Sequence, residues 1–179
     1  MDLDDIILVN ELDEQTGTSS KTLVHEKGWL HRAFSVFVFD KEGRMLLQRR
    51  AEGKYHCGGL WTNTCCSHPR PGELTEAAAH RRLQEEMGFD TDLEEIFHFI
   101  YQAPFDNGLT EHEFDHVFAG EFDGRIEPDP NEVSEYQYLH LYKIAQLVKQ
   151  NPEAFTPWFL LALPRVEEWW NKRYQRLLA

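Results

Sequence analysis

Cysteine, long apolar runs and positive charge are all scarce in this sequence, and each shortage excludes a possibility. Three cysteines among 179 residues cannot all pair within the chain. Two of them, Cys65 and Cys66, are adjacent, and adjacent cysteines rarely bond to each other because the ring strains the backbone. No segment approaches the ~18 apolar residues of a membrane span. We therefore expect neither a Cys65–Cys66 disulfide nor a membrane-spanning helix.

Negative charge dominates the chain, whose formal net charge is -13. Such a chain repels a phosphate backbone or an anionic membrane surface unless a local basic stripe overrides the net field, and the sequence shows no such stripe. Residues 1–5 are acidic, whereas a signal peptide would begin with basic residues. We expect a cytoplasmic protein with neither a nucleic-acid nor a membrane partner.

The chain length and the residue patterns predict one domain, residues 1–179, of the α+β class with a mixed sheet flanked by helices. No repeat, low-complexity tract or linker interrupts the chain. Strands are expected at 33–40 and 45–50 as a hairpin, at 96–105 and 113–122 across a turn at 106–108, and at 133–141. Helices are expected at 75–87, at 157–163 after Thr156, and at about 165–178.

The helix predicted at 75–87 carries acidic residues in its last turn, where basic residues would be more favourable. Glu85 and Glu86 occupy its last turn, where the helix dipole already presents partial negative charge. Arg81 and Arg82 stand one turn earlier and can pair with them at i,i+4 spacing. These residues alone are therefore compatible with a solvated helix end that pairs its own charges.

With Glu73 included, the same region reads Glu-x7-Arg-x-Leu-x-Glu-Glu-x-Gly-Phe and resembles the Nudix box. In that family a loop and a helix hold carboxylates toward a divalent metal, which in turn binds a diphosphate. Two positions differ: Ser67 replaces a usual glycine, and Arg82 replaces a glutamate of the hydrolytic metal cluster. An arginine can bind diphosphate as a planar donor fork, so the change predicts binding without hydrolysis.

The stretch Thr62-Asn63-Thr64-x-Cys66-x-His68-Pro69, at fixed distance from Glu86, resembles the type 1 isopentenyl-diphosphate isomerases, the non-hydrolytic branch of the Nudix superfamily. The resemblance covers residues 21–158. It implies a Nudix-like α/β/α sandwich. It also implies conversion of isopentenyl diphosphate into dimethylallyl diphosphate, by protonation of the terminal CH₂ and loss of a proton from C2.

The resemblance implies that four residues perform the reaction. Cys66 matches the acid/base group on one face of the substrate, and Glu113, helped by Tyr101, matches the group on the other face. Trp158 matches an aromatic wall, and an indole face stabilises cationic carbon well. Taken without the resemblance, Cys66 is compatible with a small buried hydrophobe and Trp158 with ordinary helix packing.

The resemblance also implies two divalent ions and a basic pocket. The implied metal ligands are His25, His31, His68, Glu111, Glu113, Glu86 and Cys66. Imidazoles and carboxylates suit Mn²⁺, Mg²⁺ or Zn²⁺ at the histidine site, while Mg²⁺ is implied between Glu86 and the substrate diphosphate. The implied diphosphate-binding residues are Lys21, Arg50, Lys54 and Arg82. The resemblance gives no role to His56, Cys57 or Cys65.

Two features of this constellation have an alternative interpretation. The i,i+2 spacing of Glu111 and Glu113 places both carboxylates on one face of an extended segment. Without the resemblance, that segment is compatible with a half-exposed strand whose acids face water and whose Phe114 faces the core. Each of the four cations, taken singly, is compatible with a solvated surface charge.

Three functions follow as hypotheses. The first is the isomerase, acting on a small-molecule diphosphate as a monomer or weak dimer. The second is a Nudix hydrolase of a diphosphate-containing substrate, which Arg82 disfavours. The third is a non-catalytic metal-binding module. Full biological activity after Cys66→Ser would support it.

Overall fold

The computed structural model describes residues 5–54 and 56–178, so the acidic residues 2 and 4 of the chain start lie outside the described residues. The described strands form a nine-stranded sheet. They are β1 (Asp5–Val9), β2 (Gln15–Ser20), β3 (His31–Phe39), β4 (Arg44–Arg50), β5 (Trp61–Thr62), β6 (Cys65–Ser67), β7 (Leu93–Pro104), β8 (Thr110–Glu121) and β9 (Val133–His140). The helices are α1 (Lys21–Lys27), α2 (Thr75–Met87), α3 (Leu141–Gln150) and α4 (Pro157–Leu178), with a 3-10 turn at Pro152–Ala154.

Strand β3 lies at the centre of the sheet and makes the sheet mixed. It runs parallel to β8 along its whole length, from the pair His31 and Glu113 to the pair Phe39 and Glu121. Strand β7 is antiparallel to β8, β6 is antiparallel to β3, and β9 is antiparallel to β4. The predicted strands at 96–105, 113–122 and 133–141 are thus confirmed as β7, β8 and β9.

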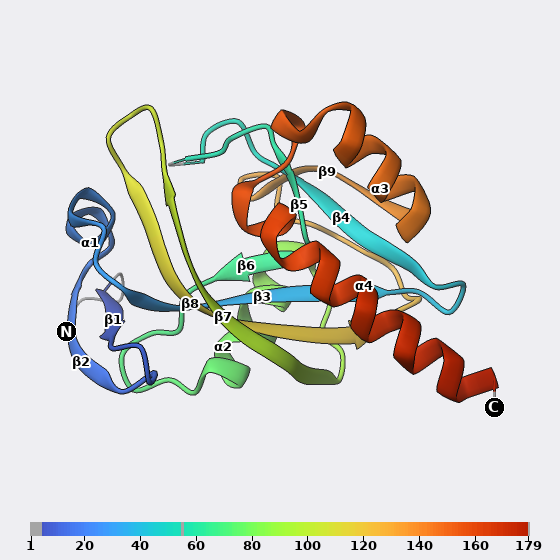
Figure 1. Ribbon diagram of the computed structural model, residues 1–179, viewed down its shortest axis with the longest axis horizontal. Coiled ribbons are helices and arrows are strands. Elements are labelled where there is room, and N and C mark those ends of the chain that lie inside the picture. Colours follow the sequence, from blue (N-terminus) through green and yellow to red (C-terminus); the bar gives the residue numbers. More distant parts are fainter. Residues whose placement is uncertain (1–4, 55, 179) are drawn as a thin grey trace.

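Two hydrophobic clusters cover the opposite faces of the sheet. Because side chains alternate along a strand, β3 contributes to both clusters. Phe34, Val36 and Val38 pack with α2 in one cluster, whereas Phe37 and Phe39 pack with α3 and α4 in the other. Figure 1 shows α2 behind the sheet and α4 in front of it. The predicted α+β class with an α/β/α layering is confirmed.

The predicted hairpin of residues 33–40 and 45–50 is correct only at its turn. Strands β3 and β4 pair at Phe39 and Met45 and then separate. Thr64 stands between them: its hydroxyl accepts from the Val38 N–H at 2.9 Å and donates to the Leu46 carbonyl at 2.8 Å. This wedge replaces the missing ladder bonds and brings the segment around residues 61–68 into the sheet.

The prediction of two C-terminal helices was wrong, because α4 runs unbroken from Pro157 to Leu178 with Pro164 inside it. A proline within a helix removes one backbone hydrogen bond and disfavours continuation. Here residues on both sides of it, among them Phe159, Leu163 and Val166, are buried in the same cluster against the sheet. Packing therefore holds one helix axis across the proline.

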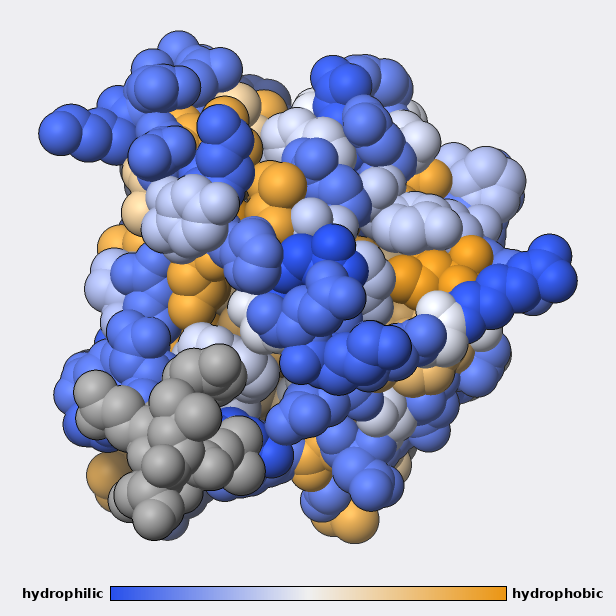
Figure 2. Space-filling model, turned by 90° about the vertical axis from the view of Figure 1, so that its right-hand side faces the viewer, coloured by the Kyte–Doolittle hydropathy of each residue, from blue (hydrophilic) through white to orange (hydrophobic). Residues whose placement is uncertain are grey.

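The side of the molecule with the β3–β4 turn is mostly hydrophilic, with small separate hydrophobic areas (Figure 2). Within the described residues, no helix is both long enough and apolar enough to cross a membrane. The three cysteines, all described, are free thiols, as expected for the Cys65 and Cys66 pair.

Candidate active site

A cavity opens between the start of β8, strand β6, the C-terminal end of α2 and the start of α4. The residues that line it are Lys21, Arg50, Lys54, His56, Cys66, Ser67, His68, Arg82, Glu86, Tyr101, Glu111, Glu113 and Trp158. Every site residue predicted from the sequence is in this lining except His25 and His31, which are fully buried behind it. The fold thus brings the predicted constellation together at one place.

One side of the cavity, here called the histidine wall, consists of His25, His31, His68, Glu111 and Glu113. The parallel pairing of β3 and β8 sets His31 opposite Glu113, and Glu111 lies two residues earlier on the same face of β8. His25 comes from α1, and His68 directly follows β6. Glu111 is 2% exposed, so the alternative in which these acids face water is wrong.

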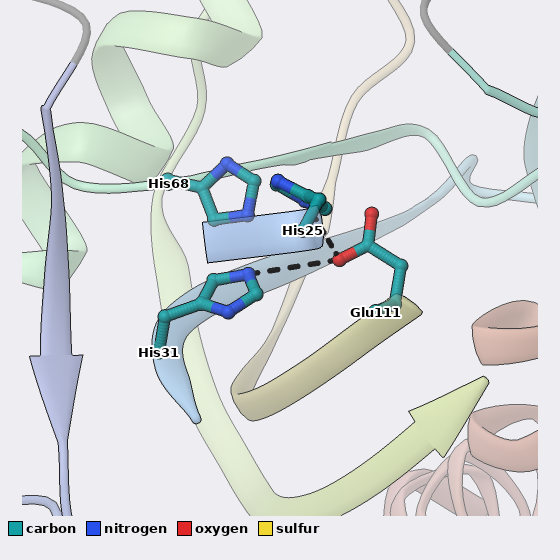
Figure 3. Close-up of side chains that lie close together, drawn as sticks. All are labelled: His25, His31, His68 and Glu111. Atoms are coloured by element: carbon teal, nitrogen blue, oxygen red, sulfur yellow. Dashed lines mark hydrogen bonds and ion pairs between the residues drawn. The ribbon is translucent and has the colours of Figure 1, made fainter. Parts of the chain in front are cut away.

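Four side chains of the histidine wall converge on one point (Figure 3). One donor atom from each of His25, His31, His68 and Glu111 lies within 4.8 Å of all the others. Glu111 Oε2 is 3.1 Å from His25 Nε2 and 3.6 Å from His31 Nε2. Glu113 lies beside this group, with Oε1 3.0 Å from His68 Nε2 and 3.6 Å from His31 Nε2.

The backbone fixes the orientation of two of these imidazoles. Nδ1 of His25 donates to the Lys21 carbonyl at 2.6 Å, and Nδ1 of His31 donates to the Trp29 carbonyl at 2.8 Å. Such bonds set the ring tautomer and direct Nε2 toward a metal. Among the described residues, the buried Nε2 of His31 has no hydrogen-bond partner. These nitrogens and carboxylate oxygens fit a divalent transition-metal ion.

The histidine wall attracts positive charge. Burial opposes ionisation of His31, yet Glu111 and Glu113 outweigh it and raise its pKa to about 9. Burial likewise opposes ionisation of Glu111, but the neighbouring imidazoles of His25, His31 and His56 hold its pKa well below the usual range. His68 differs, because burial lowers its pKa to about 4 and leaves a neutral ring. A neutral imidazole beside two carboxylates is the form that binds a metal.

Glu113 is held at both oxygens. Oε1 faces His68, and Oε2 accepts a hydrogen bond of 2.6 Å from the Tyr101 hydroxyl. Tyr101 and Glu113 are direct cross-strand partners on β7 and β8, which explains the contact. The carboxylate therefore has one orientation in the cavity.

Cys66 faces the cavity while its neighbour Cys65 faces the core. Alternation along β6 places Cys65 in the cluster under α2, fully buried, and directs Cys66 to the opposite face. Arg50 Nη1 lies 3.7 Å from the Cys66 sulfur. Burial raises the pKa of Cys66 to about 12, so the thiol carries its proton near neutral pH.

Trp158, at the start of α4, is buried and also forms part of the cavity lining. Its indole N–H donates to the Thr62 hydroxyl at 3.0 Å, and that hydroxyl donates to Asn63 Oδ1 at 2.8 Å. The guanidinium of Arg50 lies 5.4 Å from the ring centre. Thr62 and Asn63, which the sequence supplied only as motif letters, therefore fix the indole.

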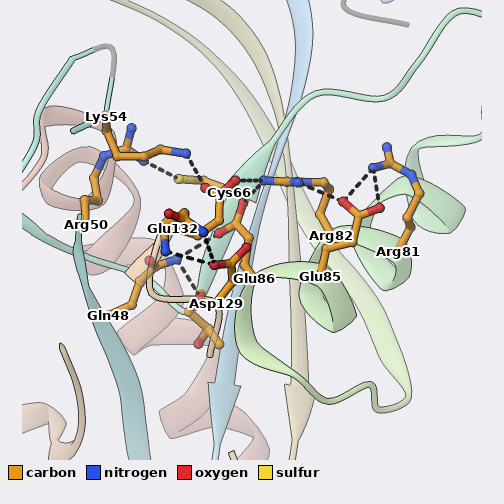
Figure 4. Close-up of polar contacts among 12 residues, drawn as sticks. Gln48, Arg50, Lys54, Cys66, Arg81, Arg82, Glu85, Glu86, Asp129 and Glu132 are labelled. Carbon is orange, nitrogen blue, oxygen red and sulfur yellow. Dashed lines mark hydrogen bonds and ion pairs between the residues drawn. The ribbon is translucent and has the colours of Figure 1, made fainter. Parts of the chain in front are cut away.

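The other side of the cavity, here called the cation wall, consists of Lys21, Arg50, Lys54 and Arg82. Figure 4 shows that the last two converge on one carboxylate. Arg82 Nη2 is 2.7 Å from Glu86 Oε1 and 3.1 Å from Glu132 Oε1, while Lys54 pairs with Glu132 Oε2. Glu86 Oε2 also accepts from the Gln48 side chain at 3.1 Å. Glu132 was not predicted.

The C-terminal end of α2 is stabilised in spite of its acidic residues. The predicted i,i+4 pairs are present, with Arg81 3.2 Å from Glu85 and Arg82 2.7 Å from Glu86. The chain after β8 returns to this end, where backbone N–H groups of residues 127 and 129 bind the carbonyls of residues 87 and 86. Gly88 is left-handed at φ 74°, and a side chain there would overlap the carbonyl of residue 127.

His56 is the second residue that the sequence did not assign. His56 lies in the loop between β4 and β5, and its Nε2 is 2.6 Å from Glu111 Oε1. Neither His56 nor Glu132 has a local signature, because each acts across the fold on a residue at least fifty positions away. The position of His56 two residues after Lys54 is the one signal that could have drawn attention to it, and the sequence gives no comparable signal for Glu132.

Comparison with known proteins fits this geometry. Residues 29–159 match the NUDIX domain, the class that the sheet and the α2 box define. Isopentenyl-diphosphate Delta-isomerase 2 of Aromatoleum aromaticum is 50% identical over 91% of this chain and 86% of its own length. Isopentenyl-diphosphate Delta-isomerase of Serratia proteamaculans is 49% identical over 97% of each chain. The chain belongs to the isopentenyl-diphosphate Delta-isomerase family.

Solved structures with low identity share the fold. A Deinococcus radiodurans protein, 24% identical, superimposes with a TM-score of 0.64 over 79% of this chain and 89% of its own. The MutT protein of Methanosarcina mazei, 20% identical, gives 0.62 over 78% and 94%. At these identities the likeness concerns the arrangement of sheet and helices alone.

Proposed function

We propose that this protein converts isopentenyl diphosphate into dimethylallyl diphosphate by adding a proton to the terminal CH₂ and removing one from C2. The relatives that carry this activity in their names are about half identical over nearly the whole chain. The observation that carries the proposal is a single cavity in which Cys66, the hydrogen-bonded pair of Tyr101 and Glu113, and Trp158 lie beside four cations.

The cation wall binds the diphosphate. Lys21, Arg50, Lys54 and Arg82 supply the positive charge that an otherwise acidic protein needs around an anionic ligand. Glu86, at the same end of α2, would hold Mg²⁺ against the diphosphate. Arginine forks suit phosphate oxygens because they donate two parallel hydrogen bonds. The hydrocarbon end of the substrate then extends toward Trp158 and the histidine wall.

The histidine wall would hold a second ion, Mn²⁺, Mg²⁺ or Zn²⁺, with His25, His31, His68, Glu111 and Glu113 as ligands. Bound divalent ions supply positive charge against the buried carboxylates and against the diphosphate. The fixed tautomers of His25 and His31 and the orphaned Nε2 of His31 support this assignment. Glu113 and the Cys66 sulfur both lie outside the group of four converging donors. Glu113 stays in the proposed ligand set because its Oε1 lies 3.0 Å from His68 Nε2 and 3.6 Å from His31 Nε2, whereas Cys66 is assigned to proton transfer.

Cys66 and Glu113 carry out the two proton transfers: one group adds a proton to the terminal CH₂ and the other removes a proton from C2. Near neutral pH the raised pKa of Cys66 keeps the proton on its thiol, and the lowered pKa of Glu113 leaves its carboxylate ionised. Burial and the neighbouring Glu111 act against the lowered pKa of Glu113, and the imidazoles of His31 and His68 beside it outweigh them. Tyr101 orients the carboxylate, and the Trp158 ring stabilises the carbocation formed between the two transfers.

Hydrolysis of a diphosphate is the competing function, and the pairing of Arg82 argues against it. A cation stands where hydrolases hold a metal-binding carboxylate, and here it binds Glu85, Glu86 and Glu132. The test incubates metal-loaded protein with isopentenyl diphosphate and measures dimethylallyl diphosphate and free phosphate together. Isomer without phosphate is expected, and Cys66→Ser should abolish it at unchanged metal content. Phosphate without isomer would establish the hydrolase instead.

The partner of this protein is thus a small-molecule diphosphate. Two further predictions from the sequence, a cytoplasmic location and a monomer or weak dimer, stay predictions. The oligomeric state is measured by sedimentation of the metal-loaded protein.

A further inference from the structure

The two carboxylate oxygens of Glu111 have different partners, and His56 is the partner of one of them. The imidazole Nε2 is 2.6 Å from Glu111 Oε1, and because a carboxylate can only accept, Nε2 carries the proton and donates it. The other oxygen, Oε2, faces His25 at 3.1 Å and His31 at 3.6 Å. One oxygen is therefore held by His56, and the other points into the group of converging metal donors.

Packing fixes the His56 ring in this position. The ring stacks on Phe105 at a centroid distance of 5.1 Å and meets the Trp158 ring edge-on at 5.9 Å. Its backbone carbonyl accepts from Arg50 Nη2 at 3.2 Å. With its side chain 6% exposed, the imidazole has little room to turn away from Glu111.

These contacts join the histidine wall to the apolar side of the cavity. A hydrogen bond to a metal-binding carboxylate selects which oxygen meets the ion, and partners of this kind typically change metal affinity by about 10-fold to 100-fold. The ring that makes this bond also touches Trp158, the proposed support for the carbocation. His56 thus contacts both sides of the cavity.

We infer that His56 is a positioning residue: it holds Glu111 so that one oxygen alone meets the divalent ion, and it fixes that carboxylate relative to Trp158. This inference rests on the proposed function and concerns the same site. It adds a fourth imidazole to the site, one that acts through Glu111. The resemblance that suggested the other histidines did not include this residue.

Mn²⁺ titration calorimetry on chelator-treated protein provides the first test. His56→Phe keeps an aromatic ring for Phe105 and Trp158 but removes the donor, and we expect Mn²⁺ affinity to fall about 10-fold to 100-fold. His56→Gln places an amide N–H at similar reach and should keep affinity within about threefold of wild type. Equal affinity in wild type and His56→Phe, or equal loss in both variants, would overturn the inference.

The visible spectrum of bound Co²⁺ provides a readout that a purely structural role would not move. Without the His56 donor, Glu111 Oε1 is free to approach the ion, so His56→Phe should change the intensity of the Co²⁺ bands while His56→Gln should not. Identical spectra for wild type and His56→Phe would contradict the positioning role.

Two controls separate the donor from the ring. His98→Phe makes the same substitution at an imidazole that is 61% exposed, and it should leave Mn²⁺ affinity unchanged. Phe105→Leu removes the stacking partner and keeps the donor, so its effect should be smaller than that of His56→Phe. Turnover of isopentenyl diphosphate by the wild type is measured separately: its absence would refute the proposed function, whereas the calorimetry tests His56 alone.

Discussion

The two walls of the cavity are built in different ways. In the histidine wall all side chains except the partly exposed His68 are buried, and the positions of His31, Glu111 and Glu113 follow from the pairing of β3 with β8 and of β7 with β8. Most of its polar atoms have a fixed partner. The cation wall comes from α1, the chain around residues 50–54 and the end of α2, and within it Arg50 is buried while Lys54 and Arg82 are partly exposed. Its members Lys54 and Arg82 are paired with carboxylates of the same protein.

This difference matches the two functions proposed for the walls, proton transfer and diphosphate binding. Proton transfer needs groups held within a fraction of an ångström, which the sheet ladder and backbone hydrogen bonds supply to Glu113 and His31. Diphosphate binding needs positive charge that can exchange one anionic partner for another. Glu132 occupies Lys54 and Arg82, and a diphosphate would compete with it for both. Substitutions in the first wall should therefore reduce kcat, and those in the second should change KM.

Glu113→Gln should have the largest effect, because Glu113 serves both as a proton-transfer group and as a proposed metal ligand. We expect kcat to fall at least about 100-fold and metal affinity to fall with it, while Tyr101 can still donate to the amide oxygen. Steady-state kinetics and elemental analysis measure the two effects. Glu121→Gln, at the far end of the same strand, is the matched control. An unchanged metal stoichiometry would remove Glu113 from the ligand set.

Arg82→Leu should raise KM about tenfold and change kcat less, because it removes a donor fork from the cation wall. Arg82→Lys keeps the charge but not the fork, and its KM should lie between those of wild type and Arg82→Leu. Since Arg82 also pairs with Glu85 and Glu86, a thermal melt of each variant is needed beside the kinetics. A fall in kcat at constant KM would erase the proposed distinction between the walls.

Glu132→Gln should act in the opposite direction and lower KM a few-fold. The substitution releases Lys54 and Arg82 from a competing carboxylate, so the diphosphate no longer has to displace an ion pair in order to bind them. Inhibition by inorganic diphosphate should strengthen in parallel. A higher KM would mean that Glu132 holds the two cations in their binding positions, and competition would then be the wrong description.

Glu73→Gln should have the smallest effect, because Glu73 supports α2 without touching either wall. Its hydrogen bonds with Arg81, at 2.7 and 2.8 Å, lower the pKa of Glu73 below its ordinary 4.5. The stabilisation is therefore complete above pH 4.5 and is lost as the pH falls through the folded-state pKa. Thermal melts should place the variant about 2 °C below wild type at neutral pH, with the gap closing in acid. A gap that is constant down to pH 3 would contradict this cause.

Local patterns in the sequence carried much of the fold. The helix-forming composition of residues 75–87 and Gly88 after them predicted α2, and i,i+4 spacing predicted its ion pairs. The turn at 106–108 predicted the β7–β8 hairpin. The i,i+2 spacing of Glu111 and Glu113 correctly placed both on one face. Helix α1 and strands β1, β2, β5 and β6 were not predicted, since they are short. Helix α3 was also missed, although Leu141, Ile144, Leu147 and Val148 recur at helical spacing and pack on one cluster.

Long-range pairing could not be predicted. Nothing near His31 indicates that β3 lies parallel to β8, eighty residues later, and it was the family resemblance that joined His31 to Glu113. The insertion of Thr64 between β3 and β4 and the unbroken helix across Pro164 depend on packing contacts that form only in the folded chain. His56 and Glu132 belong to the same category.

Proton NMR of isopentenyl diphosphate in D₂O with the metal-loaded protein tests most directly whether both walls act on one substrate. We predict loss of the terminal vinyl signal, growth of the dimethylallyl signals and deuterium uptake, all abolished by a chelator and by Cys66→Ala. An unchanged spectrum from folded, metal-loaded protein would contradict the isomerase, and it would leave the histidine wall as a metal site for a different reaction.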